Sequence, residues 1–374
     1  MIIGVPKEIK NNEYRVAIVP CGVKNLVEHG HRVIIQNSAG AIAGISDEDY
    51  VAAGADLKLS AEEIFQKSEM IVKVKEPLPQ EYNLLQEDQL LFTYLHLAAA
   101  PDLTKALLER KIVGIAYETV QLDNGSLPLL TPMSEIAGKL SIQIGAHYLE
   151  NENGGSGVLL GGVPGVHPAE VTIVGGGTVG SNAARIALGM GANVTILDIN
   201  LDRLRYLDDI LHGRLNLIAS NSENIEKAII EADLVIGGLL IPGAKAKKII
   251  TRKMISQMRK GSVVVDVAID QGGCVETSHP TTFEDPTFLI EGIIQYCVAN
   301  IPGCVARTST FALTNATFPY ILKLANIGYS EALNQDIPLK RGLNVFKGKL
   351  TNKRVSDAVG IEYLPYDSGP ACIC

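Results

Sequence analysis

Hydrophobic residues in the first third of the chain form short β-rich runs, separated by segments of helical spacing. The runs predict strands at residues 2–5, 32–36, 70–75, 90–94 and 111–116. Between them, residues 21–29 and 61–67 carry apolar side chains at the spacing of amphipathic helices. Strands that alternate with helices predict a parallel sheet with helical crossovers.

A second alternation follows a helical pattern at residues 133–152 and a glycine-dense connector at 153–165, which we expect to be a loop or hinge. Short β-branched runs then predict buried parallel strands at 171–174, 193–197, 232–236 and 262–267. Beyond about residue 307 the sequence is less regular, with a helical stretch that opens at Phe318. We expect this last part to return to the first domain.

The predicted fold class is therefore α/β, with two Rossmann-like doubly wound parallel-sheet domains separated by a cleft. The first domain is discontinuous and comprises residues 1–130 plus 307–374. The second, at residues 131–306, is an insertion in it. A length of 374 residues suits two domains of ordinary size.

Composition and charge narrow the class of protein. Apolar residues make up 47% of the chain and charged residues 20%, as in core-forming enzymes rather than disordered chains. A net charge of -8 without a basic run argues against nucleic acid as a partner. No segment approaches the roughly 18 apolar residues of a membrane span, and Lys7, Glu8 and Lys10 replace the apolar start of a signal peptide. We therefore expect a cytoplasmic protein. The six cysteines are widely spread, which predicts reduced thiols and no metal site.

The strongest motif is a G-x-G-x-x-G turn between the strand at 171–174 and a helical run at 181–187. Gly175 permits the tight turn, Gly177 lets the backbone approach a pyrophosphate, and Gly180 lets the helix pack on the strand. The amino terminus of that helix faces the phosphates with unpaired N–H groups. The hexapeptide alone also fits a glycine-rich turn without a ligand, but the flanking strand and helix favour a dinucleotide site.

Asp198 ends the next strand, where an acidic residue accepts hydrogen bonds from the ribose hydroxyls of the adenosine. A carboxylate there would repel a 2′-phosphate, so the motif predicts NAD rather than NADP. Flavin is the competing dinucleotide, although in flavoproteins this motif usually opens the chain. The inserted domain is thus predicted to bind NAD, and the discontinuous domain to bind the substrate.

Hydride transfer to NAD also needs a cation that holds an anionic substrate, a proton carrier, and a group that orients water or an amine. Arg15 could grip a carboxylate with two parallel hydrogen bonds, although a lone arginine is more often a surface residue. Lys75 closes a predicted strand at its carboxyl end, where open α/β sheets place their ligands. Its alternative is a solvated strand terminus, and Lys73 could fill the same role less well.

The proton carrier and the orienting group are predicted at two further strand ends. His96 lies in an apolar setting that more often holds a hydrogen-bonded core histidine, yet imidazole is the natural acid and base near neutral pH. Asp270 follows an apolar run, and a carboxylate there is costly to bury unpaired, so it either has a cationic partner or works in the cleft. Asp266, inside that run, is predicted to be a structural acid.

In these segments the sequence resembles the bacterial alanine dehydrogenase family, part of a larger group with the NAD-binding subunit of proton-pumping transhydrogenase and the saccharopine-type dehydrogenases. The likeness covers nearly the whole chain and includes residues 3–10 with Arg15, 72–77, 93–98, 132–135, 161–166, the glycine turn, 241–246, 270–274 and 312–317. The transhydrogenase branch lacks the residues that match His96 and Asp270, so this chain is similar to the complete enzymes. His279 departs from the family, whose members often carry an arginine near the cofactor there.

The resemblance implies the reversible NAD-dependent oxidative deamination of L-alanine to pyruvate and ammonia by a homohexamer. Arg15 and Lys75 would hold the substrate, His96 would be the proton donor and acceptor, and Asp270 would be the second catalytic residue. The family also implies cofactor contacts beyond the three glycines of the turn and Asp198, at Ser134, Thr178, Val179, Arg203, Ser220, Leu239, Leu240, Val267, Ile269, Val298, Asn300 and Ile301.

Two other functions fit the same sequence. One is a saccharopine-like or opine-type dehydrogenase that condenses a larger amino acid with a keto acid. The other is a module that binds NAD without catalysis. Rates with alanine against lysine or glutamate separate the first, and the turnover of His96→Ala and Asp270→Asn variants separates the second.

Overall fold

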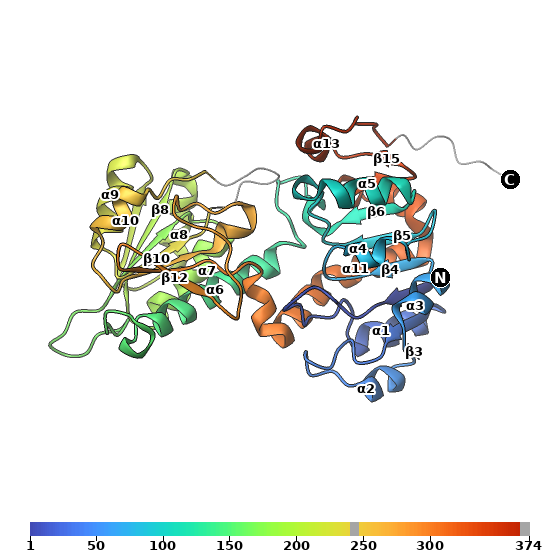
Figure 1. Cartoon of the computed structure of the whole chain (residues 1–374), viewed down its shortest axis with the longest axis horizontal. Helices are drawn as coiled ribbons and strands as arrows, with labels where there is room; N and C mark the ends of the chain where they lie inside the picture. The colour runs from blue at the N-terminus through green and yellow to red at the C-terminus, as the bar shows by residue number, and fades with distance from the viewer. Residues whose placement is uncertain (240–246, 367–374) are drawn as a thin grey trace. The chain divides into compact units, whose positions relative to one another are not determined.

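The computed structural model describes residues 1–239 and 247–366. The chain divides into two compact units, Met1–Met133 with Gly303–Cys374, and Ser134–Pro302. Both units pair a β-sheet with helices (Figure 1), which confirms the predicted α/β class. Within the described ranges, no helix is both long enough and apolar enough to cross a membrane.

The first unit contains an eight-stranded sheet. In spatial order its strands are β15 (Lys349–Leu350), β14 (Leu343–Phe346), β6 (Val113–Ala116), β5 (Leu90–Thr93), β4 (Met70–Val72), β1 (Ile2–Val5), β2 (Arg32–Gln36) and β3 (Asp56–Lys58). All pairs from β6 to β3 are parallel, whereas β14 runs antiparallel to both β6 and β15. The helices of this unit are α1 (Pro20–Glu28), α2 (Asp47–Ala52), α3 (Ala61–Lys67), α4 (Pro79–Tyr82), α5 (Pro101–Glu109), α11 (Ala306–Gln335), α12 (Ile337–Arg341) and α13 (Lys353–Val359), with 3₁₀ turns η1 (Leu97–Ala99) and η2 (Tyr117–Thr119).

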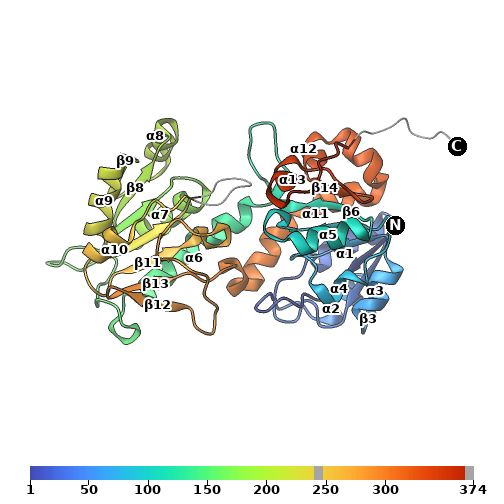
Figure 2. The ribbon, with the colours of Figure 1, turned by 45° about the horizontal axis from the view of Figure 1, so that its top comes forward.

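The second unit contains a seven-stranded sheet. Its spatial order is β12 (Thr287–Ile290), β13 (Ile293–Tyr296), β11 (Val263–Asp266), β10 (Leu234–Gly237), β7 (Glu170–Val174), β8 (Asn193–Asp198) and β9 (Leu215–Ala219), and Figure 2 shows β11, β13 and β12 side by side. Only the pair of β12 with β13 is antiparallel among these strands. The helices are α6 (Thr131–Tyr148), which begins just before the unit boundary, α7 (Thr178–Gly189), α8 (Leu201–Ile210), α9 (Ser222–Glu231) and α10 (Arg252–Gln257), with η3 (Asn151–Asn153), η4 (Val267–Gln271) and η5 (Ile301–Val305), which runs across the second boundary.

The continuous apolar runs of the sequence form the central strands of both sheets. Every residue of β5, β6, β10 and β11 is buried, as expected for parallel strands covered on both faces. Helix α6 packs closely against α7 and β10 of the second unit at two of its glycines. A Cβ on Gly138 would lie 2.2 Å from the carbonyl oxygen of Val179, and one on Gly145 would lie 2.5 Å from methyl groups of Leu234. The glycines of α6 therefore set its approach to α7 and β10.

The structure differs from the sequence prediction at several elements. The predicted strand at 70–75 ends at Val72, and the helix predicted at 133–152 ends at Tyr148. The part expected to be irregular forms the 30-residue helix α11, which begins well before Phe318 and bends at Gly328, where φ is 72°. Parallel pairing holds for the central strands, and the antiparallel strands β12, β14 and β15 extend the sheets at one side.

Candidate active site

Three predicted site residues lie at the carboxyl end of the first sheet. Arg15 lies in the loop after β1, while Lys75 and His96 each follow their strands, β4 and β5, by three residues. These strands are neighbours and parallel, so their carboxyl ends lie at the same end of the sheet. Ligands of open α/β sheets bind at this end, close to a point where the strand order reverses, and β4 and β1 form such a point here.

Arg15 is buried, with 2% of its surface exposed, so the alternative of a surface arginine is wrong. Its Nε and Nη2 donate to the two carboxylate oxygens of Glu13 at 2.7 and 2.5 Å, and Nη1 lies 2.9 Å from Sδ of Met133. Burial opposes the charge, but the Glu13 carboxylate outweighs it and raises the pKa of Arg15. The guanidinium is thus a fixed cation whose plane is set by a buried ion pair.

The two neighbouring lysines have different surroundings. Lys73 is 1% exposed, and its Nζ lies 2.9 Å from Oε1 of Glu81 and 3.2 Å from Oε2 of Glu8. This triad commits Lys73 to the interior. Lys75 is held through its backbone, since its N–H donates to Glu8 at 3.3 Å and its carbonyl accepts from Oγ1 of Thr93 at 3.0 Å.

His96 lies on the surface, so the alternative of a core histidine is wrong. Its backbone is left-handed, with φ of 50° and ψ of 35°. Its N–H donates to Oε1 of Glu118 at 2.6 Å. Its ring lies nearly parallel to that of Tyr94, with 5.7 Å between centroids and 6° between planes. Tyr94 is itself fixed, because its hydroxyl donates to the carbonyl of Leu129 at 2.6 Å.

Glu76 links these groups electrostatically. Its Oε1 accepts from Nζ of Lys10 at 2.5 Å. Burial would raise the pKa of this carboxyl, but Lys10, and then Lys75 and His96, lower it below the ordinary value. The carboxyl end of the first sheet therefore gathers fixed cations, paired carboxylates and one exposed imidazole.

The glycine turn in the second unit has the form that a dinucleotide site needs. Gly175 has φ of 102°, which favours glycine, and a Cβ on Gly180 would lie 1.8 Å from the carbonyl oxygen of Gly175. A Cβ on Gly177 would meet nothing within 4 Å, so open space adjoins the backbone at that position. Thr178 and Val179 open α7, and their N–H groups lie in its first turn. The residues present thus fit the cofactor predicted from the sequence.

Asp198 and Arg203 brace this turn from the adjoining strand and helix. Oδ2 of Asp198 accepts from the N–H of Gly176 at 2.7 Å, and Oδ1 accepts from that of Asn200 at 2.8 Å. Arg203 donates from Nε to the carbonyl of Gly176 at 2.6 Å. The Asp198 side chain is half-buried beside the turn.

The other predicted cofactor contacts follow the carboxyl ends of successive strands across the second sheet. They are Ser220 after β9, Leu239 after β10, Val267 and Ile269 after β11, and Val298, Asn300 and Ile301 after β13. Ser134 is half-buried in α6. Leu240 and the motif at 241–246 lie outside the described residues.

Asp270 also belongs to this end of the second sheet. It is exposed in η4, and its Oδ1 accepts from the N–H of Asn300 at 3.1 Å. Asp266 is confirmed as a structural acid, because it is fully buried and accepts from the N–H groups of Ala268, Cys274 and Val275. The two aspartates of this segment thus have separate roles.

His279, the departure from the family, is exposed. Its ring stacks on that of Phe288, with 3.9 Å between centroids and 28° between planes. The stack on Phe288 fixes the orientation of this imidazole.

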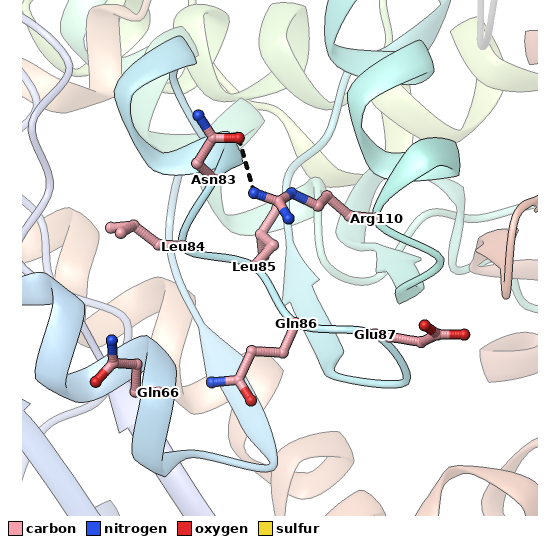
Figure 3. Close-up of a pocket in the computed structure, with 7 residues that line it drawn as sticks. All are labelled: Gln66, Asn83, Leu84, Leu85, Gln86, Glu87 and Arg110. Atoms are coloured by element: carbon pink, nitrogen blue, oxygen red, sulfur yellow. Dashed lines mark hydrogen bonds between the residues drawn. The ribbon is translucent and has the colours of Figure 1, made fainter.

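A cavity of about 530 Å³ in the first unit lies away from the predicted site (Figure 3). Residues 83–87 of its lining precede β5 and Arg110 precedes β6, so the cavity lies at the amino ends of these strands. The lining residues are Gln66, Asn83, Leu84, Leu85, Gln86, Glu87 and Arg110. Arg110 donates to Oδ1 of Asn83 at 2.7 Å and to the carbonyl of Tyr82 at 2.9 Å. Its guanidinium therefore fixes the turn after α4, and the cavity has no part in the site.

Sequence reasoning missed Glu13, Glu118 and the role of Tyr94. Glu118 could have been found, because it follows β6 at the same carboxyl end that drew attention to Lys75 and His96. Glu13 precedes Arg15 by two residues, and only the folded loop turns its carboxylate onto the guanidinium. No signal in the sequence shows the ring contact of Tyr94 with His96.

Two family models match the chain. The model described as alanine dehydrogenase/PNT, N-terminal domain, matches residues 4–137, and the one described as alanine dehydrogenase/PNT, C-terminal domain, matches residues 141–353. An alanine dehydrogenase of Methanococcus maripaludis is 60% identical over 366 residues, which is 98% of each chain.

Solved structures agree with these matches. A structure of L-alanine dehydrogenase superposes with a TM-score of 0.93 at 55% identity, over 96% of this chain and 99% of that one. The structure of a transhydrogenase from Sinorhizobium meliloti has a TM-score of 0.80 at 21% identity, over 94% of this chain and 99% of that one, and shows the shared fold. The chain belongs to the alanine dehydrogenase/PNT family.

Proposed function

We propose that this chain is an alanine dehydrogenase that catalyses the reversible, NAD-dependent oxidative deamination of L-alanine to pyruvate and ammonia. The proposal rests on one observation above all: His96 and Asp270, the two residues that the family resemblance implies are catalytic, are both exposed and lie at the carboxyl ends of the two sheets. Identity of 60% over nearly the full length of an alanine dehydrogenase supports the same activity.

NAD is the proposed cofactor, and it supplies the acceptor for the hydride that leaves Cα of alanine. Gly175, Gly177 and Gly180 would cradle the pyrophosphate against the amino terminus of α7. Asp198 would bind the ribose hydroxyls while its two backbone bonds keep it beside the turn. The predicted contact residues after β10, β11 and β13 would help to hold the cofactor.

Arg15 and Lys75 would bind and orient the substrate. The Nε and Nη2 edge of Arg15 is held by Glu13, and this fixed cation would attract the substrate carboxylate. Because the ion pair fixes the guanidinium plane, the cation loses little freedom when alanine binds. Lys73 fits this role less well, because its Nζ pairs with two buried carboxylates.

His96 would carry protons, first from the amino group and later to and from the oxygen of the carbinolamine. Loss of hydride from Cα leaves an imine, to which water adds at carbon; cleavage of the C–N bond then releases ammonia and pyruvate. Asp270 would position the attacking water or, in reverse, ammonia. The balance is alanine, NAD⁺ and water giving pyruvate, ammonium, NADH and one proton.

The test is NADH formation across a panel of amino acids, measured by absorbance with NAD and again with NADP. We expect the highest kcat/KM with alanine and NAD. NADH consumption that requires lysine or glutamate together with a keto acid, without NADH formation from alanine, would favour the saccharopine-like alternative, because reductive condensation oxidises NADH. NAD binding without turnover of any amino acid would favour the non-catalytic module.

We extend the proposal to a homohexamer in the cytoplasm. The family resemblance supports the first point. The second rests on the wide spread of the six cysteines, which favours reduced thiols. Light scattering should give six times the 40.0 kDa mass of one chain, and a monomer or dimer at working concentration would contradict the assembly.

A further inference from the structure

We propose that Glu118 is a positioning residue for His96: its carboxylate holds the left-handed backbone from which the proton carrier projects. The inference rests on the proposed function, because it gives a reason for the conformation of a residue whose catalytic role is itself proposed. Glu118 would act only through His96 and would not touch the substrate.

The backbone of His96 needs an external support. A residue other than glycine rarely adopts φ of 50°, and such conformations persist where the surrounding structure determines them. Burial of the side chain is the usual support, but the imidazole of His96 is exposed. Contacts that hold the left-handed φ and ψ angles are therefore expected at the backbone.

Glu118 supplies those contacts. Its Oε1 accepts from the N–H of His96 at 2.6 Å, and both of its oxygens lie 3.2 Å from the N–H of Leu95. One carboxylate thus binds two consecutive N–H groups at the point where the chain leaves β5, and hydrogen bonds to an ionised acceptor are stronger than neutral ones. Glu118 itself lies in η2, directly after β6, the neighbour of β5.

Tyr94 fixes the other side of the imidazole. It is 3% exposed, its hydroxyl is bonded to Leu129, and its ring lies parallel to that of His96. With the ring plane set by Tyr94, the direction of the Cα–Cβ bond of His96 depends on the backbone angles that Glu118 maintains. Loss of Glu118 should misplace the imidazole without disturbing Arg15 or the dinucleotide turn.

The experiment begins with the full-length wild-type protein, alanine and NAD. Absence of NADH formation would overturn the proposed function and this inference with it. Given an active wild type, Glu118→Ala should lower kcat at least tenfold, with KM for alanine and the Kd of NADH changed less than threefold. Glu118→Gln keeps an oxygen acceptor and should recover most of kcat.

Glu87→Ala is the matched control, because Glu87 lies in the same unit at the opposite end of the sheet and makes an exposed pair with Lys111. It should keep wild-type kcat. An unchanged kcat in Glu118→Ala, or an increase in KM and in the Kd of NADH as large as the loss in kcat, would overturn the positioning role.

A second measurement keeps the inference testable if Glu118→Ala is unstable. Glycine adopts the left-handed conformation without strain, so a protein with His96→Gly has less need of the support. Glu118→Ala should therefore lower the thermal midpoint less in the His96→Gly background than in the wild type. An equal decrease in both backgrounds would show that Glu118 supports the fold independently of His96.

Discussion

The carboxyl ends of the two sheets are built by different means. In the first unit, buried side-chain charges dominate: Arg15 pairs with Glu13, and Lys73 with Glu8 and Glu81. In the second unit, the backbone dominates, with a glycine turn, the first turn of a helix, and acids held by N–H groups. A small zwitterion needs fixed charges, whereas a dinucleotide needs a long surface that side chains do not obstruct.

This difference in construction sets different vulnerabilities. Removing one partner of a buried ion pair leaves an uncompensated charge, which is strongly destabilising. Adding one carbon to a glycine turn blocks the ligand or distorts the turn. Stability should thus depend most on the first end, and cofactor affinity most on the second.

The Lys73→Met substitution is expected to have the largest effect, a loss of stability. Glu8 and Glu81 would be left buried without their cation, at a cost of about 3–5 kcal/mol in the free energy of unfolding. Chemical denaturation measures this cost. Lys67→Met is the control, because it removes an exposed pair with Glu63 and should cost less than about 1 kcal/mol. Equal stability of the two variants would contradict the contrast.

The next largest effect is expected for Gly180→Ala, which should weaken the binding of the dinucleotide. The new Cβ would lie 1.8 Å from the carbonyl oxygen of Gly175, so the turn must open. We expect NADH affinity to fall roughly 100-fold, or about 2.7 kcal/mol, in a fluorescence titration. Gly189→Ala, in the same helix, meets nothing within 4 Å and should bind NADH within about twofold of wild type. Wild-type affinity in Gly180→Ala would refute the role of the turn.

A smaller effect is expected for the choice of cofactor. Asp198→Asn keeps an oxygen for the N–H of Gly176 but removes the charge that repels a 2′-phosphate. The preference for NAD over NADP, as a ratio of kcat/KM, should decrease about tenfold, or about 1.4 kcal/mol. An unchanged ratio would mean that another group excludes the phosphate.

These contrasts also show what the sequence can and cannot reveal. The strands at 2–5 and 32–36 and the helix at 61–67 were predicted with their observed bounds, because their apolar spacing is regular. The strands β9 and β12 were missed, since edge strands are half-exposed and lack a continuous apolar run. The helix α11 was underestimated because its apolar residues are not confined to one face and Pro319 lies inside it.

The candidate site likewise has parts that the sequence predicts and parts that it does not. Glycine spacing predicted a turn whose backbone the structure now describes, because that geometry is local. The burial of Arg15 against Glu13, and the contact of Glu118 with His96, depend on how loops fold over neighbouring strands. Glu118 follows His96 by 22 positions, and no periodicity in the sequence joins the two residues.

The smallest expected effect is the pH dependence contributed by Glu76. Burial raises its pKa, but Lys10, Lys75 and His96 together lower it below the ordinary 4.5, so the ionised carboxylate stabilises the fold above about pH 4.5. That contribution is lost as the pH falls through the lowered value. Glu76→Gln should be destabilised by less than about 1 kcal/mol at pH 7, because Lys10 is partly exposed, and should match the wild type only once the pH is below the lowered pKa of Glu76. A constant difference across this range would contradict the assignment.

The central claim is that proton transfer belongs to the first unit and cofactor binding to the second. Its most direct test is a paired measurement on His96→Ala: turnover with alanine and NAD, and NADH affinity by titration. We predict that kcat falls by a factor of about 10²–10⁴ while the Kd of NADH stays within about twofold of wild type. Full turnover in this variant, or loss of NADH binding in step with turnover, would contradict the account.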